Sequence, residues 1–262
     1  MSYQVIAPPP SLKKYVNYFW ALDAEIDAAV PKTFTVMSSG EPGLIFQQCA
    51  GVFTGFEKEP LPQLFVFGQA TQYGQLECSG SFRSIGISLQ PTALKSLFGL
   101  DAKELTDENI CISNLSKTSL SEQLLECNSA QQQASCIFNF LQAQIKQHDT
   151  ENKKLQYAVT ALQQGKKLPF VLHELNLSER SLERLFLTHI GITPILYARI
   201  CRFQSSLTLM RQGRARSLTD VAYSLGYFDQ AHFIRDFKKF AGVSPGIYLR
   251  KAIERMPGFP EW

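Results

Sequence analysis

The stretch SLTDVAYSLGYFDQAHFIRDFKKFAGVSPGIYLRK, residues 217–251, carries the clearest structural pattern in this chain of 262 residues. A short apolar segment ending at Leu225 is followed by the turn GYFD and by a longer segment in which Phe233, Phe237 and Phe240 recur. Spacings of four and three place these rings on one face of an α-helix. A short helix, a tight turn and a longer helix predict a helix-turn-helix unit.

The same design occurs upstream, where the stretch LSERSLERLFLTHIGITPILYARICR occupies residues 177–202. A short segment containing Leu172 and Leu175 leads through the turn NLS into a helix marked by Leu182, Leu185 and Phe186. The sequence therefore predicts two helix-turn-helix units in tandem.

Helical periodicity continues from residue 153 onward, and glycines stand where helices are expected to end. We predict seven helices, at residues 153–164, 169–175, 179–189, 194–212, 218–225, 230–240 and 245–251. Side chains that accept hydrogen bonds from free N–H groups precede five of these helices. They are Ser178, Thr193, Ser217, Asp229 and Ser244.

The helix expected at 194–212 joins the two units and would be about 28 Å long at 1.5 Å per residue. Two helices separated by about one turn of DNA, near 34 Å, can enter successive major grooves. The faces opposite the apolar stripes carry polar and basic side chains that are suited to base edges and phosphates. These candidate contacts are Arg180, Glu183 and Arg184 in the first unit and Ala231, His232, Arg235 and Lys239 in the second.

Residues 153–251 resemble the DNA-binding domain of AraC/XylS-type transcription regulators, most closely through the pattern of residues 217–251. The resemblance implies base contacts by Arg180, Ser181, Glu183 and Arg184 and by Gln230, Ala231, His232 and Arg235. Two departures occur in the first unit, with Leu172 in place of the usual small alanine and Asn176 in place of the usual glycine. Asn tolerates the left-handed conformation that such a turn requires.

Individual polar residues allow more than one interpretation. Glu183 either accepts from cytosine or pairs with Arg180 or Arg184 and orients that guanidinium. His232 is expected to contact a phosphate or a base edge. His189 is expected to interact with the C-terminus of its helix, and His173 is expected to be structural.

In the N-terminal half, residues 33–89 lack the helical periodicity of residues 153–251 and instead have short β-type runs separated by turn residues. We predict strands at residues 33–37, 44–47, 52–56, 64–67, 73–77 and 82–89. In the last strand Ile85, Ile87 and Leu89 alternate with smaller residues, which is typical of a strand with one buried face. The segments YVNYFW, PGLIF and SIGISLQPTALKSLFG within residues 1–115 resemble N-terminal sensor domains of some AraC-type regulators, which implies a cupin-like sheet fold.

Residues 119–147 have a helical pattern throughout, after a short helix expected at residues 94–98. Its apolar stripe consists of Ala134, Ile137, Phe138, Leu141 and Ile145. The stripe either packs against the N-terminal sheet or forms a subunit interface, with a dimeric role for the flank around Gln144 and Lys146 left open.

Charge divides the chain near residue 152. Residues 1–152 hold nine Lys and Arg against fifteen Asp and Glu, a net charge of −6, whereas the remainder holds 17 against 8, a net charge of +9. A basic half suits phosphate binding. We therefore predict an α+β two-domain protein, with a β-rich, cupin-like domain and flanking helices at residues 1–147, a linker at 148–152, and an all-α domain of seven helices at 153–262.

Several functional classes are excluded by the sequence. No apolar run approaches the ~20 residues of a membrane span, and the start lacks the apolar segment of a signal peptide, so a cytoplasmic location is expected. The six cysteines form no CxxC pair, and we expect reduced, mostly buried thiols. The first 147 residues contain no histidine. We therefore expect no catalytic residue, no metal and no cofactor.

The sequence predicts a transcription regulator, an activator or a repressor, that binds specific double-stranded DNA and responds to a small-molecule effector or partner at its N-terminal domain. RNA polymerase and a second copy of the chain are the further partners considered, and no membrane is expected. The alternative is a ligand-independent architectural or interaction protein whose N-terminal domain only assembles subunits. A preformed apolar cavity in the sheet domain would favour the first interpretation, and a filled core the second.

Overall fold

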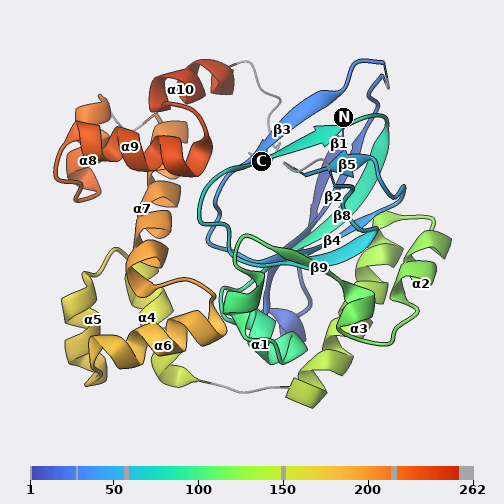
Figure 1. The fold of residues 1–262 in the computed structure, drawn as a ribbon, viewed down its shortest axis with the longest axis horizontal. Helices are drawn as coiled ribbons and strands as arrows, with labels where there is room; N and C mark the ends of the chain where they lie inside the picture. The colour runs from blue at the N-terminus through green and yellow to red at the C-terminus, as the bar shows by residue number, and fades with distance from the viewer. Residues whose placement is uncertain (1, 28, 56–58, 149–151, 214–216, 254–262) are drawn as a thin grey trace.

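The structure is a computed structural model that describes the whole chain except residues 1, 28, 56–58, 149–151, 214–216 and 254–262. For residues 146–148 and 251–253 it describes the backbone alone. Figure 1 shows a β-rich part beside a helical part, with α7 running between the α4–α6 group and the α8–α10 group. The predicted fold class, a β-rich N-terminal domain followed by a helical C-terminal domain, is confirmed.

Two antiparallel sheets form the N-terminal domain. The larger sheet has the strand order β1-β2-β8-β4-β6-β9, and the smaller sheet has the order β3-β7-β5. The strands of the larger sheet are β1 (Ser2–Ile6), β2 (Val16–Ala24), β8 (Phe82–Leu89), β4 (Gly43–Gln47), β6 (Leu64–Phe67) and β9 (Asn109–Cys111). Those of the smaller sheet are β3 (Lys32–Val36), β7 (Gly74–Cys78) and β5 (Phe53–Thr54). The sequence analysis missed β1, β2 and β9.

Strand β8 is buried on both faces, so the prediction of a single buried face is wrong. Ser84 and Ser88 are buried together with Ile85 and Ile87. A Cβ atom at Gly86 would lie 2.0 Å from Cζ2 of Trp20, so only glycine fits beneath that ring. Gly86 is therefore small because the Trp20 ring, which packs in the core between the sheets, lies above it.

The region after β8 forms three α-helices: α1 (Ala93–Phe98), α2 (Leu120–Glu126) and α3 (Ala130–His148). The expected uninterrupted helix at 119–147 is wrong, because Cys127 leaves the helical conformation with φ −72° and ψ 132°.

The apolar stripe of α3 lies in the core. Ala134, Ile137 and Leu141 are fully buried, and the rings of Phe138 and Phe19 are 4.1 Å apart. The interpretation as core packing is therefore confirmed for this stripe. Gln144 is itself buried, so it does not offer the outward flank that was considered for a dimer.

The helical part contains the seven predicted helices within the described residues. They are α4 (Lys153–Gln163), α5 (Leu168–Leu175), α6 (Glu179–His189), α7 (Pro194–Arg211), α8 (Leu218–Ser224), α9 (Gln230–Ala241) and α10 (Pro245–Ile253). One continuous core joins them, with Phe186, Tyr197, Phe203, Phe233 and Phe237 almost fully buried. The predicted linker is described only at His148, which ends α3, and at Asn152, which caps α4. Residues 149–151 of that linker lie outside the described residues.

The six cysteines differ in burial. Cys78 is buried, but Cys49 is exposed and the other four are half-buried, so the expectation of mostly buried thiols is wrong. Within the described ranges no group of three or more His, Cys, Asp or Glu side chains is arranged to hold a metal ion. Across that same part of the chain, no helix combines the length and apolar character of a membrane span.

Candidate nucleic-acid interface

The two helix-turn-helix units are α5–α6 and α8–α9. Ser178 caps α6 by accepting a hydrogen bond from the Ser181 N–H at 3.2 Å. Asp229 caps α9 by accepting from the His232 N–H at 2.6 Å. Each cap fixes the point at which the second helix of its unit begins, as predicted from the sequence.

The turn of the first unit contains Asn176 in the left-handed conformation, at φ 49° and ψ 52°. This confirms that Asn replaces glycine here without loss of the turn. Leu172, the second departure from the family pattern, is half-buried and packs against the core of the helical part. Its carbonyl oxygen accepts the Leu177 N–H at 3.1 Å.

The expected contact residues of α6 lie largely on its outer surface. Arg180, Glu183 and Arg184 are exposed, whereas Ser181 is half-buried with its hydroxyl 2.9 Å from that of Ser178. Within the described part of the chain, Glu183 forms no ion pair with Arg180 or Arg184, so the expected pairing is not observed. Both guanidinium groups are therefore unrestrained by that carboxylate.

On α9 the expected residues differ in their surroundings. Ala231, Arg235 and Lys239 are exposed. Gln230 is half-buried, and its amide oxygen accepts the hydroxyl of Thr219 at 2.7 Å. The outward basic surface of this helix therefore rests on Arg235 and Lys239, to which the exposed Lys238 adds a third charge.

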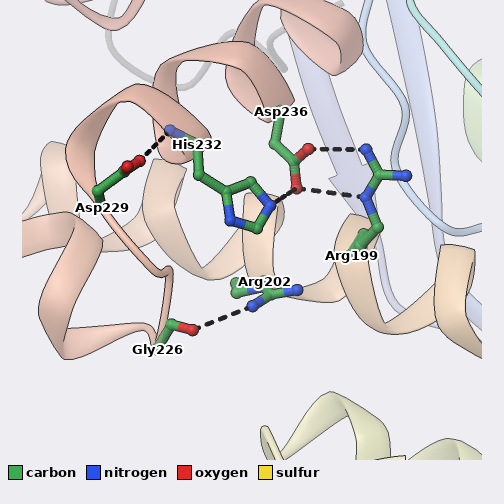
Figure 2. Close-up of polar contacts among 6 residues, drawn as sticks. All are labelled: Arg199, Arg202, Gly226, Asp229, His232 and Asp236. Atoms are coloured by element: carbon green, nitrogen blue, oxygen red, sulfur yellow. Dashed lines mark hydrogen bonds and ion pairs between the residues drawn. The ribbon is translucent and has the colours of Figure 1, made fainter.

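His232 is half-buried, and it faces inward toward Asp236 rather than outward (Figure 2). Its Nε2 lies 3.9 Å from Oδ2 of Asp236, and its ring meets the Tyr227 ring edge-on with centroids 5.3 Å apart. The expected contact of His232 with DNA stays a prediction, because the side chain is 34% exposed but lies against Asp236 in this structure. In this position His232 helps to hold the start of α9.

Asp236 is the buried charge at the centre of this network. Only 3% of its side chain is exposed, and it accepts hydrogen bonds from Nη2 and Nε of Arg199 at 2.7 and 3.4 Å. The hydrogen bond to Asp236 raises the pKa of Arg199, which keeps the guanidinium charged. Because Arg199 lies on α7, the pair fixes α9 to the helix that joins the two units.

A second arginine of α7 supports the turn before α9. Arg202 donates to the carbonyl oxygen of Gly226 at 3.2 Å, as Figure 2 shows, and its guanidinium lies 4.6 Å from the centre of the Tyr227 ring. A cation above an aromatic face is attracted by the ring quadrupole. Arg202 therefore holds the turn in place from the side of the joining helix.

The sequence analysis did not single out Asp236, Arg199 or Arg202, although the position of Asp236 is a signal that a buried ion pair is present. Asp236 stands three residues after Phe233 and one before Phe237, inside the apolar stripe of α9. A carboxylate in such a stripe is buried and needs a partner. Arg199 and Arg202 lie on the neighbouring α7, and nothing in their own spacing singles out either one as that partner.

The N-terminal domain contacts the C-terminal end of α9 and the segment just after α6. Beside α9, the N–H groups of Ser38 and Tyr73 donate to the carbonyl oxygens of Phe240 and Lys239, each at 3.1 Å. After α6, the Thr106 hydroxyl donates to the carbonyl oxygen of Gly191 at 2.7 Å. Lys239 and Phe240 lie in the last turn of α9, where helix carbonyls lack partners within the helix.

At the same junction, the backbone at the end of α9 lies close to a side chain of the N-terminal domain. Gly242, which ends α9 in the left-handed conformation at φ 73°, lies under Tyr73, and a Cβ atom there would be 2.6 Å from the tyrosine ring. Gln204 of α7 adds a further bond, donating to the Ser38 carbonyl oxygen at 2.7 Å. The junction is therefore built from backbone contacts as well as from side chains.

The positions of His189 and His173 were only partly anticipated. His189 ends α6 at the junction, where burial lowers its pKa, as does the charge of Lys95, while Asp101 acts in the opposite direction. His173 is exposed, with Nδ1 3.5 Å from Glu174, so the expectation of a structural role is wrong.

Comparisons with known proteins divide the chain in the same way. A family model described as "Helix-turn-helix domain" matches residues 171–251, and one described as "Domain of unknown function (DUF6597)" matches residues 4–111. An uncharacterized HTH-type transcriptional regulator of Haemophilus influenzae is 30% identical over 107 residues, which are 39% of this chain and 35% of that protein. The HTH-type transcriptional activator RhaR of Yersinia pseudotuberculosis is 31% identical over 114 residues, 42% of this chain and 39% of that protein.

The chain thus spans little more than a third of the length of these two relatives. Among solved structures, ToxT from Vibrio cholerae O395 is similar at a TM-score of 0.48 and 14% identity, covering 88% of this chain and 97% of that one.

The C-terminal part of the chain is a helix-turn-helix domain, as its fold and the matching family model show together. It is of the AraC type, and it follows an N-terminal domain of the DUF6597 family.

Proposed function

We propose that the protein is a sequence-specific, double-stranded-DNA-binding transcription regulator whose α6 and α9 enter successive major grooves. The observation that carries the proposal is the pair of capped recognition helices with exposed basic residues, joined by a single rigid helix. The 18 residues of α7 span about 27 Å at 1.5 Å per residue. That length is compatible with two helices placed roughly one DNA turn apart.

The exposed side chains suggest distinct roles. Arg180 and Arg184 on α6 and Arg235 on α9 would read base edges, because a guanidinium can donate two hydrogen bonds to guanine. Lys239 and Lys238 at the end of α9 would bind phosphates. Smaller contacts are assigned to Ser181, Glu183, Gln230 and Ala231, and His232 would reach DNA only after leaving Asp236.

Regulation would act through the junction between the domains. Ser38, Tyr73 and Thr106 donate to carbonyl groups at the end of α9 and just after α6, so any shift of these residues alters how the two helices are placed. An effector or partner that favours one arrangement of the N-terminal domain would then change DNA affinity by linkage.

The packing of large apolar side chains in the sheets supports the alternative, in which the N-terminal domain assembles or orients without an effector. Phe19, Phe46 and Leu64 pack the larger sheet, and Phe53 and Phe82 pack between the sheets. A hollow between the domains, beside Tyr15 and His189, measures about 20 Å³, which is enough for one water molecule. An effector of metabolite size would enter this hollow only after a rearrangement.

Selection from random duplex DNA with the full chain tests the proposal. We expect a site with two half-sites about one helical turn apart. Arg184→Ala and Arg235→Ala should then alter base preference in different half-sites. If both variants altered the same half-site, only one unit would dock in a groove; if no duplex were selected, sequence-specific binding would be disproved.

The DNA-binding experiment can be repeated in the presence of metabolite fractions from a cell extract. It then distinguishes regulation by an effector from assembly or orientation without an effector. A fraction that changes affinity supports an effector, and its effect should disappear in the segment 152–262. The proposed domain boundaries, 1–147 and 153–262, predict that this segment folds alone.

A further inference from the structure

The two turns of the helix-turn-helix units are closed in the same way. The Leu177 N–H donates to the Leu172 carbonyl oxygen at 3.1 Å, and the Tyr227 N–H donates to the Ala222 carbonyl oxygen at 2.9 Å. Leu177 and Tyr227 therefore occupy equivalent positions, and both side chains turn inward onto the core.

The second turn is longer by one residue, and that residue is Phe228. In the first unit the capping residue Ser178 follows Leu177 directly. In the second, Phe228 separates Tyr227 from the capping residue Asp229. The shorter turn closes with the same hydrogen bond, so closure of the turn does not require the added phenylalanine.

The Phe228 side chain is also unpacked. It is 86% exposed, which is the highest exposure among the large apolar residues of the described chain. Single exposed apolar residues are common on protein surfaces. The exposure of Phe228 is significant because of its location. This residue immediately precedes Asp229, which caps α9, the helix proposed to enter the groove.

We propose that the Phe228 ring binds an apolar edge of the DNA, a thymine methyl group or a deoxyribose, next to the base pairs read by α9. The inference rests on the proposed function. The N-terminal residues of a recognition helix are those that approach base edges, and a phenylalanine contact with the thymine methyl is an established form of direct readout. The exposed Lys238 and Lys239 on the same helix supply the attraction to phosphate.

The variants Phe228→Ser and Phe228→Leu test the contact on the duplex selected by the full chain. Phe228→Ser should weaken binding about five- to tenfold through loss of buried apolar area, and Phe228→Leu should weaken it less. The matched control is Tyr157→Ser, which removes a half-exposed ring from α4, in the other group of helices (Figure 1). It should bind as the unaltered protein does. Thermal unfolding of Phe228→Ser should match that of the unaltered protein, because the ring is not packed.

Replacing single thymines by deoxyuridine separates the two apolar edges. If the ring contacts a methyl group, one replacement near the α9 half-site weakens the unaltered protein and has no further effect on Phe228→Ser. If it contacts deoxyribose, no replacement matters, but Phe228→Ser still binds weakly.

Unaltered binding by Phe228→Ser, on a duplex where Arg235→Ala binds weakly, would overturn this contact and leave the proposed function standing. Normal DNA binding by Phe228→Ser with reduced transcription in a purified system would also overturn it, and would assign the ring to a protein partner instead. Failure of the unaltered protein to select any duplex would overturn both proposals.

Discussion

Arg199 and Asp236 lie 37 residues apart in the sequence, yet they are joined by a hydrogen bond of 2.7 Å and a second of 3.4 Å. The pair connects α7 to α9 and brings His232 close to the same carboxylate. One buried aspartate thus controls how the second recognition helix is attached to the joining helix.

Asp236→Ala should lower the free energy of unfolding by about 2 kcal/mol, because it removes the charged hydrogen bonds to Arg199, whose side chain is one third exposed. Urea unfolding measures the change. The double variant Arg199→Met/Asp236→Leu should recover most of the loss, since it removes both charges and keeps apolar volume. A single variant as stable as the unaltered protein would show that the pair does not hold the helices together.

Arg235→Ala should weaken specific DNA binding by about 1 to 3 kcal/mol and relax preference at one or two base pairs, because an arginine in the groove discriminates through hydrogen bonds. Binding to all single-base variants of the selected site measures this. Lys238→Ala is the control, with a loss that is similar for every sequence. An unchanged preference profile for Arg235→Ala would remove this residue from base readout.

The segment 152–262 should bind DNA without the N-terminal domain, because both helix-turn-helix units and most of the basic charge lie within it. The logarithm of its affinity should fall linearly with the logarithm of salt concentration, by about 0.9 per phosphate neutralised. Titrations at several salt concentrations give the slope. Salt-independent binding would contradict an interface made by lysine and arginine.

Glu41→Gln should stabilise the protein at neutral pH. Burial raises the pKa of Glu41, and hydrogen bonds from Ser88 and Asn17 oppose that effect only in part. The folded state therefore holds this proton more tightly than the unfolded state, so stability falls as the pH rises from 4.5 through the raised pKa. Thermal unfolding should show the gain shrinking toward pH 4.5; a gain that is the same at every pH would exclude Glu41 as its source.

Replacing both Ile137 and Leu141 with lysine should destabilise the N-terminal domain by several kcal/mol, because both side chains are fully buried beneath the sheet. Thermal unfolding and sedimentation are measured together. A folded monomer with unchanged melting would show instead that these residues form a contact between subunits.

The helical half could be predicted from sequence because its signals are local. Apolar spacing, a capping side chain such as Asp229 and a terminating glycine such as Gly242 all lie within one helix or its ends. Strand β2 was missed because it is buried along much of its length and lacks a clear alternation. Its place in the sheet depends on β8, more than sixty residues later.

The candidate site was predictable only on its outer surface. Exposed Arg180, Arg184 and Arg235 follow from the position of each apolar stripe. The inward orientation of His232 does not, because it depends on Asp236 and on an arginine from another helix. His232 and Asp236 are four residues apart within α9, but the arginine that holds Asp236 comes from α7, and no spacing within α9 encodes that partner.

The hydrogen bonds of the junction have a consequence for the order of folding. Gln204 is 166 residues from Ser38, and Gly191 is 85 residues from Thr106. The bonds that close each helix-turn-helix turn, from Leu177 to Leu172 and from Tyr227 to Ala222, join residues only five apart. Because closing a long loop costs more entropy than closing a short one, local contacts form first. During synthesis each helix-turn-helix unit therefore forms before the contacts that fix its orientation against the β-rich domain.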